Sequence, residues 1–328
     1  MPDAGIPFHP IATGKLRRYW TWQNLTDLAV NVPAGIWQAW RQLGQIGPDL
    51  VFATGGFVAL PVVAGAAARR IPVVIHEQTT VPGLANRLAA RVASRIAVTF
   101  PETAAHFSRA RCVVTGNPFR EELRRGSRER GFEQFGLDPA APLIYVTGGA
   151  LGAHRINRLV GDALPALLGV TQVIHQAGAH PATGDREWLD ARRAALPASL
   201  RERYRSVSYI DAELGDVYAA ARLVVGRAGA GTVNECCQLA LPALYIPLPG
   251  ARGDEQMANA RLVEAAGGCV VLPEPALTAE SLVAAITDVL AAPGRLKELG
   301  EHAHRLARAD AAQRIADLLV QTARDGRG

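Results

Sequence analysis

Residues 143–168 read LIYVTGGALGAHRINRLVGDALPALL, and this stretch predicts one complete strand–turn–helix unit. It begins with a short apolar run, turns at a pair of glycines, and continues with apolar residues at helical spacing. A strand that is apolar along its whole length is typical of a sheet covered by helices on both faces. The stretch therefore predicts a parallel α/β fold.

The same alternation of short apolar runs and helical patterns extends in both directions along the chain. The strands expected before residue 119 are 49–56, 71–77, 96–100 and 112–118, with a weaker candidate at 5–11. The strands expected after residue 140 are 143–149, 172–178, 207–210, 222–229, 243–250 and 269–274. The repeated pattern predicts two Rossmann-like domains, with a cleft where the carboxyl ends of their strands face each other.

The break between the two series is a charged stretch with few apolar residues. We expect a first domain at 1–118, a linker with a short helix at 119–140, a second domain at 141–305 and a C-terminal helix at 306–328 that packs back on the first domain. The first domain looks short, because a doubly wound domain normally has a first strand and a first glycine loop well before residue 49. We therefore expect it to be incomplete at its N-terminus.

Composition excludes several classes of protein. The chain has 328 residues, of which 49% are hydrophobic and 20% charged, as in a globular protein. It contains no apolar run of the roughly 20 residues that cross a bilayer and no signal-peptide core. Its 4 cysteines lack metal-ligand spacing and are too few for a disulfide framework, which favours a reducing cytoplasm. The net charge of +5 favours an anionic partner without identifying it.

Three glycine clusters follow predicted strands and open helices, at Gly55–Gly56, at 148–152 and at Gly229–Gly231. Helix N-termini present free N–H groups to anions, and glycine lets the backbone approach closely. Strand-to-helix turns also need glycine for purely structural reasons. No cluster has the complete dinucleotide fingerprint, and no lysine followed by serine or threonine marks a P-loop. Their joint occurrence favours a different phosphate-bearing ligand.

The most informative residue near these turns is Glu235, in GRAGAGTVNE at 226–235. We expect it in the first turn of the helix, where the helix dipole mildly favours an acid. The functional alternative is that its carboxylate accepts hydrogen bonds from two vicinal ribose hydroxyls while the glycine turn holds a diphosphate. A nucleotide diphosphate sugar presents both groups.

Two further polar stretches follow predicted strands. Residues 254–259 start a helix, where their side chains suit sugar hydroxyls; the alternative is ordinary helix capping by Asp254. His76 and Glu77 end a buried strand, a position suited to acid–base chemistry or to a sugar contact, although such pairs are more often structural.

Together these motifs resemble the MurG family of bacterial glycosyltransferases. The matching pieces run in family order over nearly the whole chain and include GGFVALPVV, IPVVIHEQTTVPGLANRLAA, GNPFR, TGGALGAHRIN, RAGAGTVNE and LPALYIPLPGARGDEQMANA. The resemblance implies a GT-B fold and an inverting transfer of N-acetylglucosamine from UDP-N-acetylglucosamine to lipid I, giving lipid II for peptidoglycan. It implies no cofactor, no bound metal, no nucleic-acid partner, and a location on the cytoplasmic face of the plasma membrane.

The resemblance also implies roles for individual residues. The donor side comprises Arg120 and Ile210 near the base, Ala150 near the diphosphate, Arg227, Gly229, Thr232 and Glu235 in the nucleotide motif, and Glu255 and Gln256 at the sugar. The acceptor and diphosphate side comprises Gly55, Gly56 and Thr79, with Glu77 and His76 as the catalytic candidates.

The chain departs from the family pattern at several positions. Ala150 stands where the family usually has serine, Glu255 where many relatives have histidine or glutamine, and Thr79 where many have asparagine. The family's first strand and its G-G-T-G-G-H-type loop, which supplies a candidate general base, have no counterpart. We expect a missing N-terminal piece or a natural truncation, and little activity from the chain as it stands.

An aromatic and basic segment at 14–43 holds 4 of the 5 tryptophans. Tryptophan favours the bilayer interface and basic residues favour anionic headgroups, so the segment predicts a membrane patch of Arg17, Arg18, Trp20, Trp22, Trp37 and Trp40. The alternatives are that several of the rings are core, or that they stack on RNA, although no RNA-binding motif accompanies them.

Two other functions remain open at this point. One is another GT-B enzyme, such as a glycolipid glycosyltransferase or a nucleotide-sugar epimerase. The other is a nucleotide-sugar-binding remnant without catalysis, which the absent loop favours.

Overall fold

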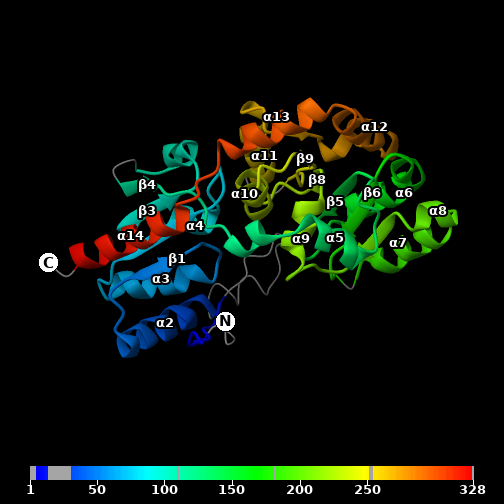
Figure 1. Ribbon diagram of the computed structural model, residues 1–328. Coiled ribbons are helices and arrows are strands. Elements are labelled where there is room, and N and C mark those ends of the chain that lie inside the picture. The colour runs from blue at the N-terminus through cyan, green and yellow to red at the C-terminus, as the bar shows by residue number, and fades with distance from the viewer. Residues whose placement is uncertain (1–4, 14–30, 109–110, 181, 251–253, 327–328) are drawn as a thin grey trace. The chain divides into compact units, whose positions relative to one another are not determined.

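The computed structural model describes residues 5–13, 31–108, 111–180, 182–250 and 254–326. The chain divides into two units, one formed by Met1–Pro118 with Asp310–Gly328 and the other by Phe119–Ala309 (Figure 1). We describe each unit by itself.

Unit 1 is built on a four-stranded parallel sheet in the order β1-β2-β3-β4. Its strands are β1 Val51–Ala53, β2 Val73–Glu77, β3 Arg95–Val98 and β4 Cys112–Val114. Its helices are α2 Val32–Ile46, α3 Ala59–Ala68, α4 Leu84–Ala89, the 3₁₀ helix η3 Pro101–His106 and α14 Ala311–Asp325.

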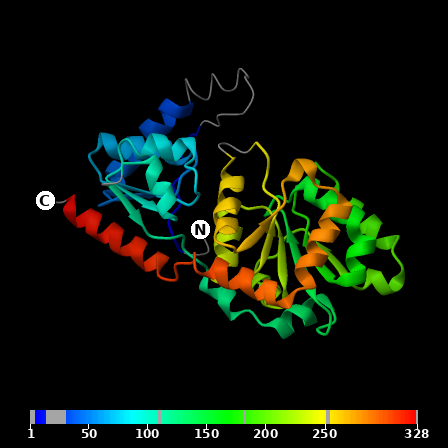
Figure 2. The same cartoon turned by 90° about the horizontal axis from the view of Figure 1, so that it is seen from above.

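The two faces of this sheet are covered by different parts of the chain. Val73 and Ile75 of β2 belong to a core shared with α2, α3 and α4, whereas Val74 between them packs against Leu318 of α14. Successive side chains of a strand point to opposite faces, so an unbroken apolar strand can fill both cores. Figure 2 shows α14 along one side of the sheet, with α2 and α3 beyond the other.

Helices α2 and α3 pack closely because of one small residue. A Cβ at Gly65 of α3 would come within 2.9 Å of the backbone nitrogen of Trp40 on α2. Helix α2 itself starts with proline in its first turn and ends at Gly47, whose left-handed conformation returns its N–H to Leu43.

Unit 2 is built on a six-stranded parallel sheet in the order β10-β9-β8-β5-β6-β7. Its strands are β5 Leu143–Thr147, β6 Gln172–Gln176, β7 Tyr204–Val207, β8 Leu223–Gly226, β9 Ala243–Tyr245 and β10 Cys269–Val271. The helices of its first half are η5 Glu121–Arg125, α5 Arg128–Phe135, α6 His154–Val170, α7 Asp185–Ala194, α8 Ala198–Arg201 and α9 Leu214–Ala220. Those of its second half are α10 Ala230–Gln238, α11 Glu255–Ala265, η7 Glu274–Ala276, α12 Ala279–Leu290 and α13 Pro293–His304.

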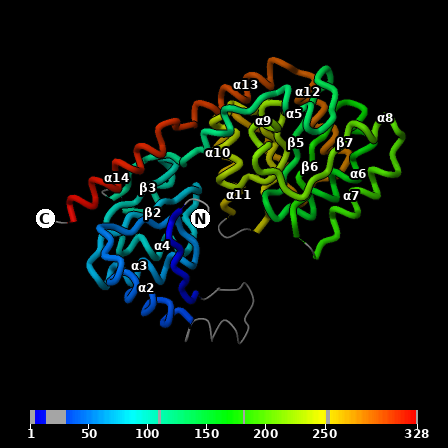
Figure 3. The backbone as a smooth tube through the Cα atoms, turned by 60° about the horizontal axis from the view of Figure 1, so that its bottom comes forward, coloured from blue at the N-terminus to red at the C-terminus, as the bar shows by residue number. Residues whose placement is uncertain are grey.

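This second sheet is also covered on both faces. Leu143 and Tyr145 of β5 belong to one core, with α5, α9, α10 and α11, while Ile144 and Val146 belong to the other, with α6 and α12. Helices α6 and α7 pack side by side over the second face, as Figure 3 shows. The strand order reverses between β5 and β8, which is the position where open α/β sheets bind ligands.

The predicted parallel α/β architecture is confirmed, with differences at particular elements. Residues 5–11 form no strand. The strand expected at 207–210 lies at Tyr204–Val207, because it is an edge strand that pairs with β6 and therefore carries the half-buried polar residues Arg205 and Ser206. Within residues 119–140, η5 and α5 pack on α9 in unit 2.

The C-terminal part of the chain forms two helices. Helix α13 ends at His304 and α14 begins at Ala311, and the two belong to different units. Leu318 of α14 packs with Val74 and Ala97 of the unit 1 sheet.

Candidate active site

The carboxyl ends of β5 and β8 carry the two glycine turns of unit 2. Because these strands are hydrogen-bonded neighbours, the turns at 148–153 and 226–230 lie side by side at the point where the strand order reverses. Each turn leads directly into a helix, α6 or α10, so free N–H groups from two helix N-termini meet at this edge. An anionic ligand is favoured there.

Glu235 lies beside these turns but not in the first turn of its helix. Helix α10 begins at Ala230 and includes Gly231. Glu235 is therefore the sixth residue of the helix. The helix dipole therefore does not account for this acid, because the effect of the dipole is confined to the first turn of a helix. Its carboxylate accepts a 2.8 Å bond from the Tyr218 hydroxyl at Oε2 and a 3.1 Å bond from Arg120 Nη2 at Oε1.

Arg120 and Tyr218 hold this carboxylate in different environments. Arg120 is half exposed, with 51% of its side chain accessible, whereas Tyr218 is buried. Partial burial lowers the pKa of the Arg120 guanidinium, but its bond to Glu235 and the charge there outweigh burial and raise the pKa. Burial raises the pKa of the Tyr218 phenol well above its ordinary value, so it remains a hydrogen-bond donor at every working pH.

The buried amide of Gln176 connects several parts of this edge. Its Nε2 donates to the Gly149 carbonyl at 3.0 Å and to Thr147 Oγ1 at 3.4 Å. Its Oε1 accepts from the backbone N–H of Ile210 at 3.0 Å and from the Tyr145 hydroxyl at 3.2 Å. The amide therefore uses both its donors and both its acceptor positions to hold the first glycine turn against the loop that follows β7.

The first glycine turn is held in place by close packing and by a hydrogen bond. A Cβ at Gly152 would come within 1.9 Å of the Ala177 carbonyl, so only glycine fits where the turns after β5 and β6 meet. Gly149 donates its N–H to Thr147 Oγ1 at 3.1 Å. Ala150, at the tip of this turn, has no hydroxyl to offer a ligand.

Arg227 follows β8, and its side chain is buried in unit 2. It is buried, its Nη1 donates to the Ile246 carbonyl at 3.0 Å, and its Nη2 lies 2.5 Å from Oε2 of Glu274. Its charge is therefore neutralised by a protein carboxylate. Of the other residues expected in this motif, Gly229 precedes α10 and Thr232 lies in its first turn, beside the free N–H groups.

Helix α11 brings the other expected sugar-binding residues to the same sheet edge. Gln256 Oε1 accepts from the Leu248 N–H at 3.0 Å, and the buried Asn259 donates to the Ala228 carbonyl at 3.2 Å, which ties α11 to the second glycine turn. Glu255 is the first residue of the helix. Within the described part of the chain the Asp254 side chain makes no capping bond, so the capping explanation for this stretch is wrong.

In unit 1, the carboxylate of Glu77 organises the loop that follows β2. Its Oε1 accepts from the N–H and the hydroxyl of Thr79 at 3.1 and 2.8 Å. Its Oε2 accepts from the Gly83 N–H at 3.3 Å and from Asn86 Nδ2 at 2.9 Å. This buried carboxylate thus binds the loop and the start of α4, and the single Thr79 hydroxyl proton is shared with the Val81 carbonyl, also at 2.8 Å.

His76 is buried beside it. Its Nε2 lies 3.0 Å from the Gly116 carbonyl, which can only accept, so this nitrogen carries the proton and Nδ1 carries the lone pair. Burial lowers the pKa of the imidazole, which therefore stays neutral at pH 7. The adjacent glycines after β1 have left-handed φ angles of 98° at Gly55 and 80° at Gly56. A Cβ at Gly55 would come within 3.0 Å of the Asn86 amide.

Of the expected membrane patch, Trp37 and Trp40 on α2 are 58% and 42% exposed. The guanidinium of Arg41 lies over the Trp37 ring and that of Arg69 over the Trp40 ring, so these two rings are surface residues and not core. Arg17, Arg18, Trp20 and Trp22 lie outside the described residues. Among the helices that the structure describes, none is long and apolar enough to span a bilayer. The described residues also include no cluster of three or more metal-ligating side chains.

Both parts of the chain match a known enzyme family. Residues 143–315 match the glycosyltransferase family 28 C-terminal domain and residues 1–98 match the N-terminal domain of the same family. The chain is 39% identical over 324 residues to a UDP-N-acetylglucosamine–N-acetylmuramyl-(pentapeptide) pyrophosphoryl-undecaprenol N-acetylglucosamine transferase of Geobacillus thermodenitrificans, covering 98% of this chain and 86% of the relative. The chain belongs to glycosyltransferase family 28.

Solved structures agree with this family 28 assignment. MurG of Acinetobacter baumannii superposes with a TM-score of 0.71 at 28% identity, covering 98% of this chain and 86% of that one. UDP-GlcNAc 2-epimerase of Neisseria meningitidis superposes with a TM-score of 0.67 at 13% identity over 93% of this chain and 84% of that one, which shows a shared fold alone. The two parallel-sheet units are those of a GT-B transferase of the MurG group.

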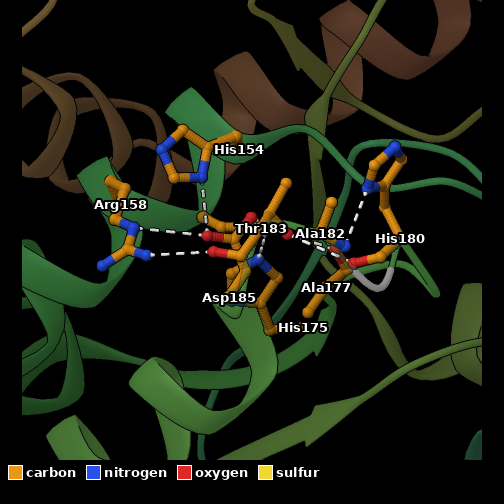
Figure 4. A network of polar contacts seen from close by, with 9 residues as sticks. His154, Arg158, His175, Ala177, His180, Ala182, Thr183 and Asp185 are labelled. Atoms are coloured by element: carbon orange, nitrogen blue, oxygen red, sulfur yellow. Dashed lines mark hydrogen bonds and ion pairs between the residues drawn. The ribbon is translucent and has the colours of Figure 1, made fainter.

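Several residues of this family 28 site were missed from the sequence. Tyr218 lies in a predicted helix and Gln176 at the end of a predicted strand, and only the fold brings them to Glu235 and Gly149. A further network surrounds the buried Asp185 at the start of α7, where His154 Nδ1 lies 2.7 Å and Arg158 Nε 3.2 Å from Oδ1, and Asn157 Nδ2 lies 2.9 Å from Oδ2 (Figure 4). Burial alone raises the pKa of Asp185, but its bonds to Asn157 and His154 outweigh this and lower it. The network ties α6 to the loop after β6.

Proposed function

We propose that this chain transfers N-acetylglucosamine from UDP-N-acetylglucosamine to lipid I, with inversion at the sugar carbon, and so produces lipid II for peptidoglycan. The observation that carries the proposal is the 39% identity, over 98% of the chain, to a relative whose name states this reaction. The arrangement of unit 2 around Glu235 supports a nucleotide-sugar donor.

The donor occupies the edge of unit 2 where the strand order reverses. The Glu235 carboxylate accepts the two ribose hydroxyls, and the diphosphate lies at the N-termini of α6 and α10. The base lies by Ile210 and Arg120, whose guanidinium donates a hydrogen bond to Glu235. Glu255 and Gln256 at the start of α11 face the sugar.

The reaction is a displacement at C1 of the donor sugar. The acceptor hydroxyl attacks from the face opposite to UDP, forms the new glycosidic bond and gives up its proton to a general base. The bond to the diphosphate oxygen breaks, and UDP leaves with the electron pair. The free N–H groups of the two helices are directed at the oxygen on which negative charge develops, which lowers the barrier without reorganisation of the site.

Glu77 and His76 serve the acceptor side. Because Glu77 accepts hydrogen bonds from Thr79, Gly83 and Asn86 within unit 1, we assign it the role of shaping the loop at 79–83 around the acceptor. His76 holds the loop after β4 through its Nε2–H bond to Gly116, and its basic atom is Nδ1. Neutral imidazole of this kind accepts a proton from a hydroxyl when the two meet.

The lipid-linked acceptor places the enzyme at a membrane surface. We assign the contact to the exposed rings of Trp37 and Trp40 with their neighbouring arginines, as expected for a peripheral protein on the cytoplasmic face.

Titration calorimetry with UDP-N-acetylglucosamine, followed by transfer assays with lipid I and with other glycolipid acceptors, tests the proposal. Binding together with transfer to lipid I supports it. Binding with transfer only to a different glycolipid identifies another GT-B glycosyltransferase. Binding without any transfer identifies a nucleotide-sugar-binding remnant, and the absence of binding contradicts the donor site itself.

A further inference from the structure

The carboxylate of Glu235 has two oxygens, and each accepts one hydrogen bond from a different described residue. Tyr218 of α9 donates to Oε2 at 2.8 Å, and Arg120, before η5, donates to Oε1 at 3.1 Å. An ionised carboxylate has about four acceptor positions. One position on each oxygen is therefore left for a ligand.

Those two remaining positions suit a vicinal diol. Two neighbouring hydroxyls on a five-membered sugar ring present two donors side by side, and a carboxylate accepts them with one oxygen each. The match requires the carboxylate plane to be fixed, because rotation about the last side-chain bond would turn the free positions away from the sugar.

Tyr218 is the partner able to fix that plane. It is 3% exposed, and its ring packs edge-on against Tyr145 with centroids 5.7 Å apart and an interplanar angle of 81°. A buried phenol needs a hydrogen-bond partner, and Glu235 provides it. Arg120, in contrast, is half exposed and sits on a long side chain, so water competes for its bond.

We propose that Tyr218 is a positioning residue for ribose recognition, which holds the Glu235 carboxylate so that its two free acceptor positions face the 2′- and 3′-hydroxyls of the donor nucleotide. The inference rests on the proposed donor site, in which Glu235 binds ribose. Tyr218 acts through Glu235 and does not itself touch the ligand.

The experiment compares the affinity for UDP with that for 2′,3′-dideoxy-UDP, measured by titration calorimetry on the wild-type chain and on Tyr218→Phe. The dissociation constant for the dideoxy nucleotide divided by that for UDP isolates the contribution of the ribose hydroxyls. Because the carboxylate is no longer fixed, Tyr218→Phe lowers this ratio by about tenfold and leaves the affinity for the dideoxy nucleotide unchanged within about twofold. Equal weakening for both nucleotides, which a merely structural role predicts, overturns the inference.

Matched variants distinguish failure of this inference from failure of the proposed donor site. Tyr204→Phe removes another buried hydroxyl of unit 2, bonded to His175 and not to Glu235, and should keep the wild-type ratio. Glu235→Gln should lose the discrimination, and Tyr218→Phe added to it should have no further effect on the ratio. If Glu235→Gln keeps the discrimination, the ribose assignment of the donor site is wrong, and the inference fails with it.

A second variant serves if Tyr218→Phe does not fold. Glu235→Asp keeps the charge but shortens the side chain, so its carboxylate no longer reaches the Tyr218 hydroxyl. Loss of the discrimination in Glu235→Asp supports the requirement for a held carboxylate, and wild-type discrimination contradicts it.

Discussion

The guanidinium of Arg227 and the carboxylate of Glu274 form an ion pair that is almost entirely inaccessible to solvent, with Nη2 and Oε2 2.5 Å apart and side-chain exposures of 11% and 13%. Arg227 follows β8, Glu274 follows β10, and Arg227 Nη1 also donates to Ile246 at the end of β9. One side chain thus joins the carboxyl ends of three neighbouring strands beneath the second glycine turn.

Removing the acid of this pair should therefore destabilise unit 2. Glu274→Gln leaves the buried guanidinium without a counter-charge, and we expect the free energy of unfolding to fall by about 3 kcal/mol. Chemical denaturation measures this loss. The matched control is Asp288→Asn, which breaks the exposed pair with Arg295 and should change the stability by less than about 1 kcal/mol. Equal effects of the two variants would contradict the bracing role of Arg227.

Gln176 should determine the affinity for the nucleotide. Gln176→Leu keeps the volume but leaves the Ile210 N–H and the Tyr145 hydroxyl without their acceptor and frees the Gly149 carbonyl. Each unpaired buried group costs about 1–3 kcal/mol, so we expect the affinity for UDP to fall by at least about tenfold. Titration calorimetry checks this, and unchanged affinity in a folded variant would show that the two loops are held by other contacts.

The strands could be predicted from the sequence because they are apolar runs bounded by glycine, proline or polar residues, which only a sheet with two covered faces accommodates. β7 was misplaced because an edge strand such as Tyr204–Val207 carries polar residues, and the more apolar run after it was the stronger signal. The start of α10 was misplaced because Gly231, which suggests a turn, lies inside the helix.

The donor side of the site was foreseen only in part. Glu235 stands out as an acid near a glycine turn, whereas nothing in an apolar run distinguishes Tyr218 from a core tyrosine. Its hydroxyl reaches Glu235 because α9 and α10 cover the same face of the sheet, which is a property of the topology and not of any local pattern. The ion pair between Arg227 and Glu274 was missed for the same reason, since 46 residues and two strands separate its partners.

Glu77→Gln should slow transfer to the acceptor without changing the binding of the donor. The new amide nitrogen faces N–H and O–H donors from Thr79, Gly83 or Asn86, so the loop at 79–83 loses part of its anchoring. We expect kcat with lipid I to fall about tenfold or more, with the KM for UDP-N-acetylglucosamine unchanged. Glu102→Gln, an exposed acid of η3 in the same unit, is the control. Wild-type turnover in Glu77→Gln would contradict the role of this residue on the acceptor side.

The exposed tryptophans should carry membrane binding. Replacing both Trp37 and Trp40 with serine removes two interfacial rings, and we expect the partition coefficient on anionic vesicles to fall by about tenfold. Binding of the wild-type chain should also weaken as salt is raised, because the neighbouring arginines contact the headgroups. Val320→Ser on α14 removes an apolar side chain that is 50% exposed and serves as the control. Co-sedimentation that is equal for the double variant and the wild type would place the membrane contact elsewhere.

Unit 2 should lose stability as the pH falls below neutrality because of His175. Burial lowers the pKa of this imidazole to about 3, although the charge of Asp185 acts in the opposite direction. Its Nε2–H donates to Asn157 Oδ1 at 3.0 Å and its Nδ1 accepts from the Tyr204 hydroxyl at 2.9 Å, so the neutral imidazole has partners at both nitrogens. The unfolded chain, with an ordinary histidine pKa of about 6.5, binds the proton first. The stabilising contribution is therefore complete above pH 6.5 and decreases as the pH falls toward 3, by about 2 kcal/mol at pH 5.

Denaturation at pH 7 and pH 5 measures this dependence of stability on His175. The wild-type chain also contains His76, whose buried imidazole contributes in the same direction in unit 1, so the comparison requires a variant of His175 alone. His175→Gln retains a donor and an acceptor but does not titrate. We expect the loss of unit 2 stability between the two pH values to be smaller in this variant by about 2 kcal/mol. Parallel pH profiles for the variant and the wild type would show that the neutral form of His175 does not govern the acid sensitivity of unit 2.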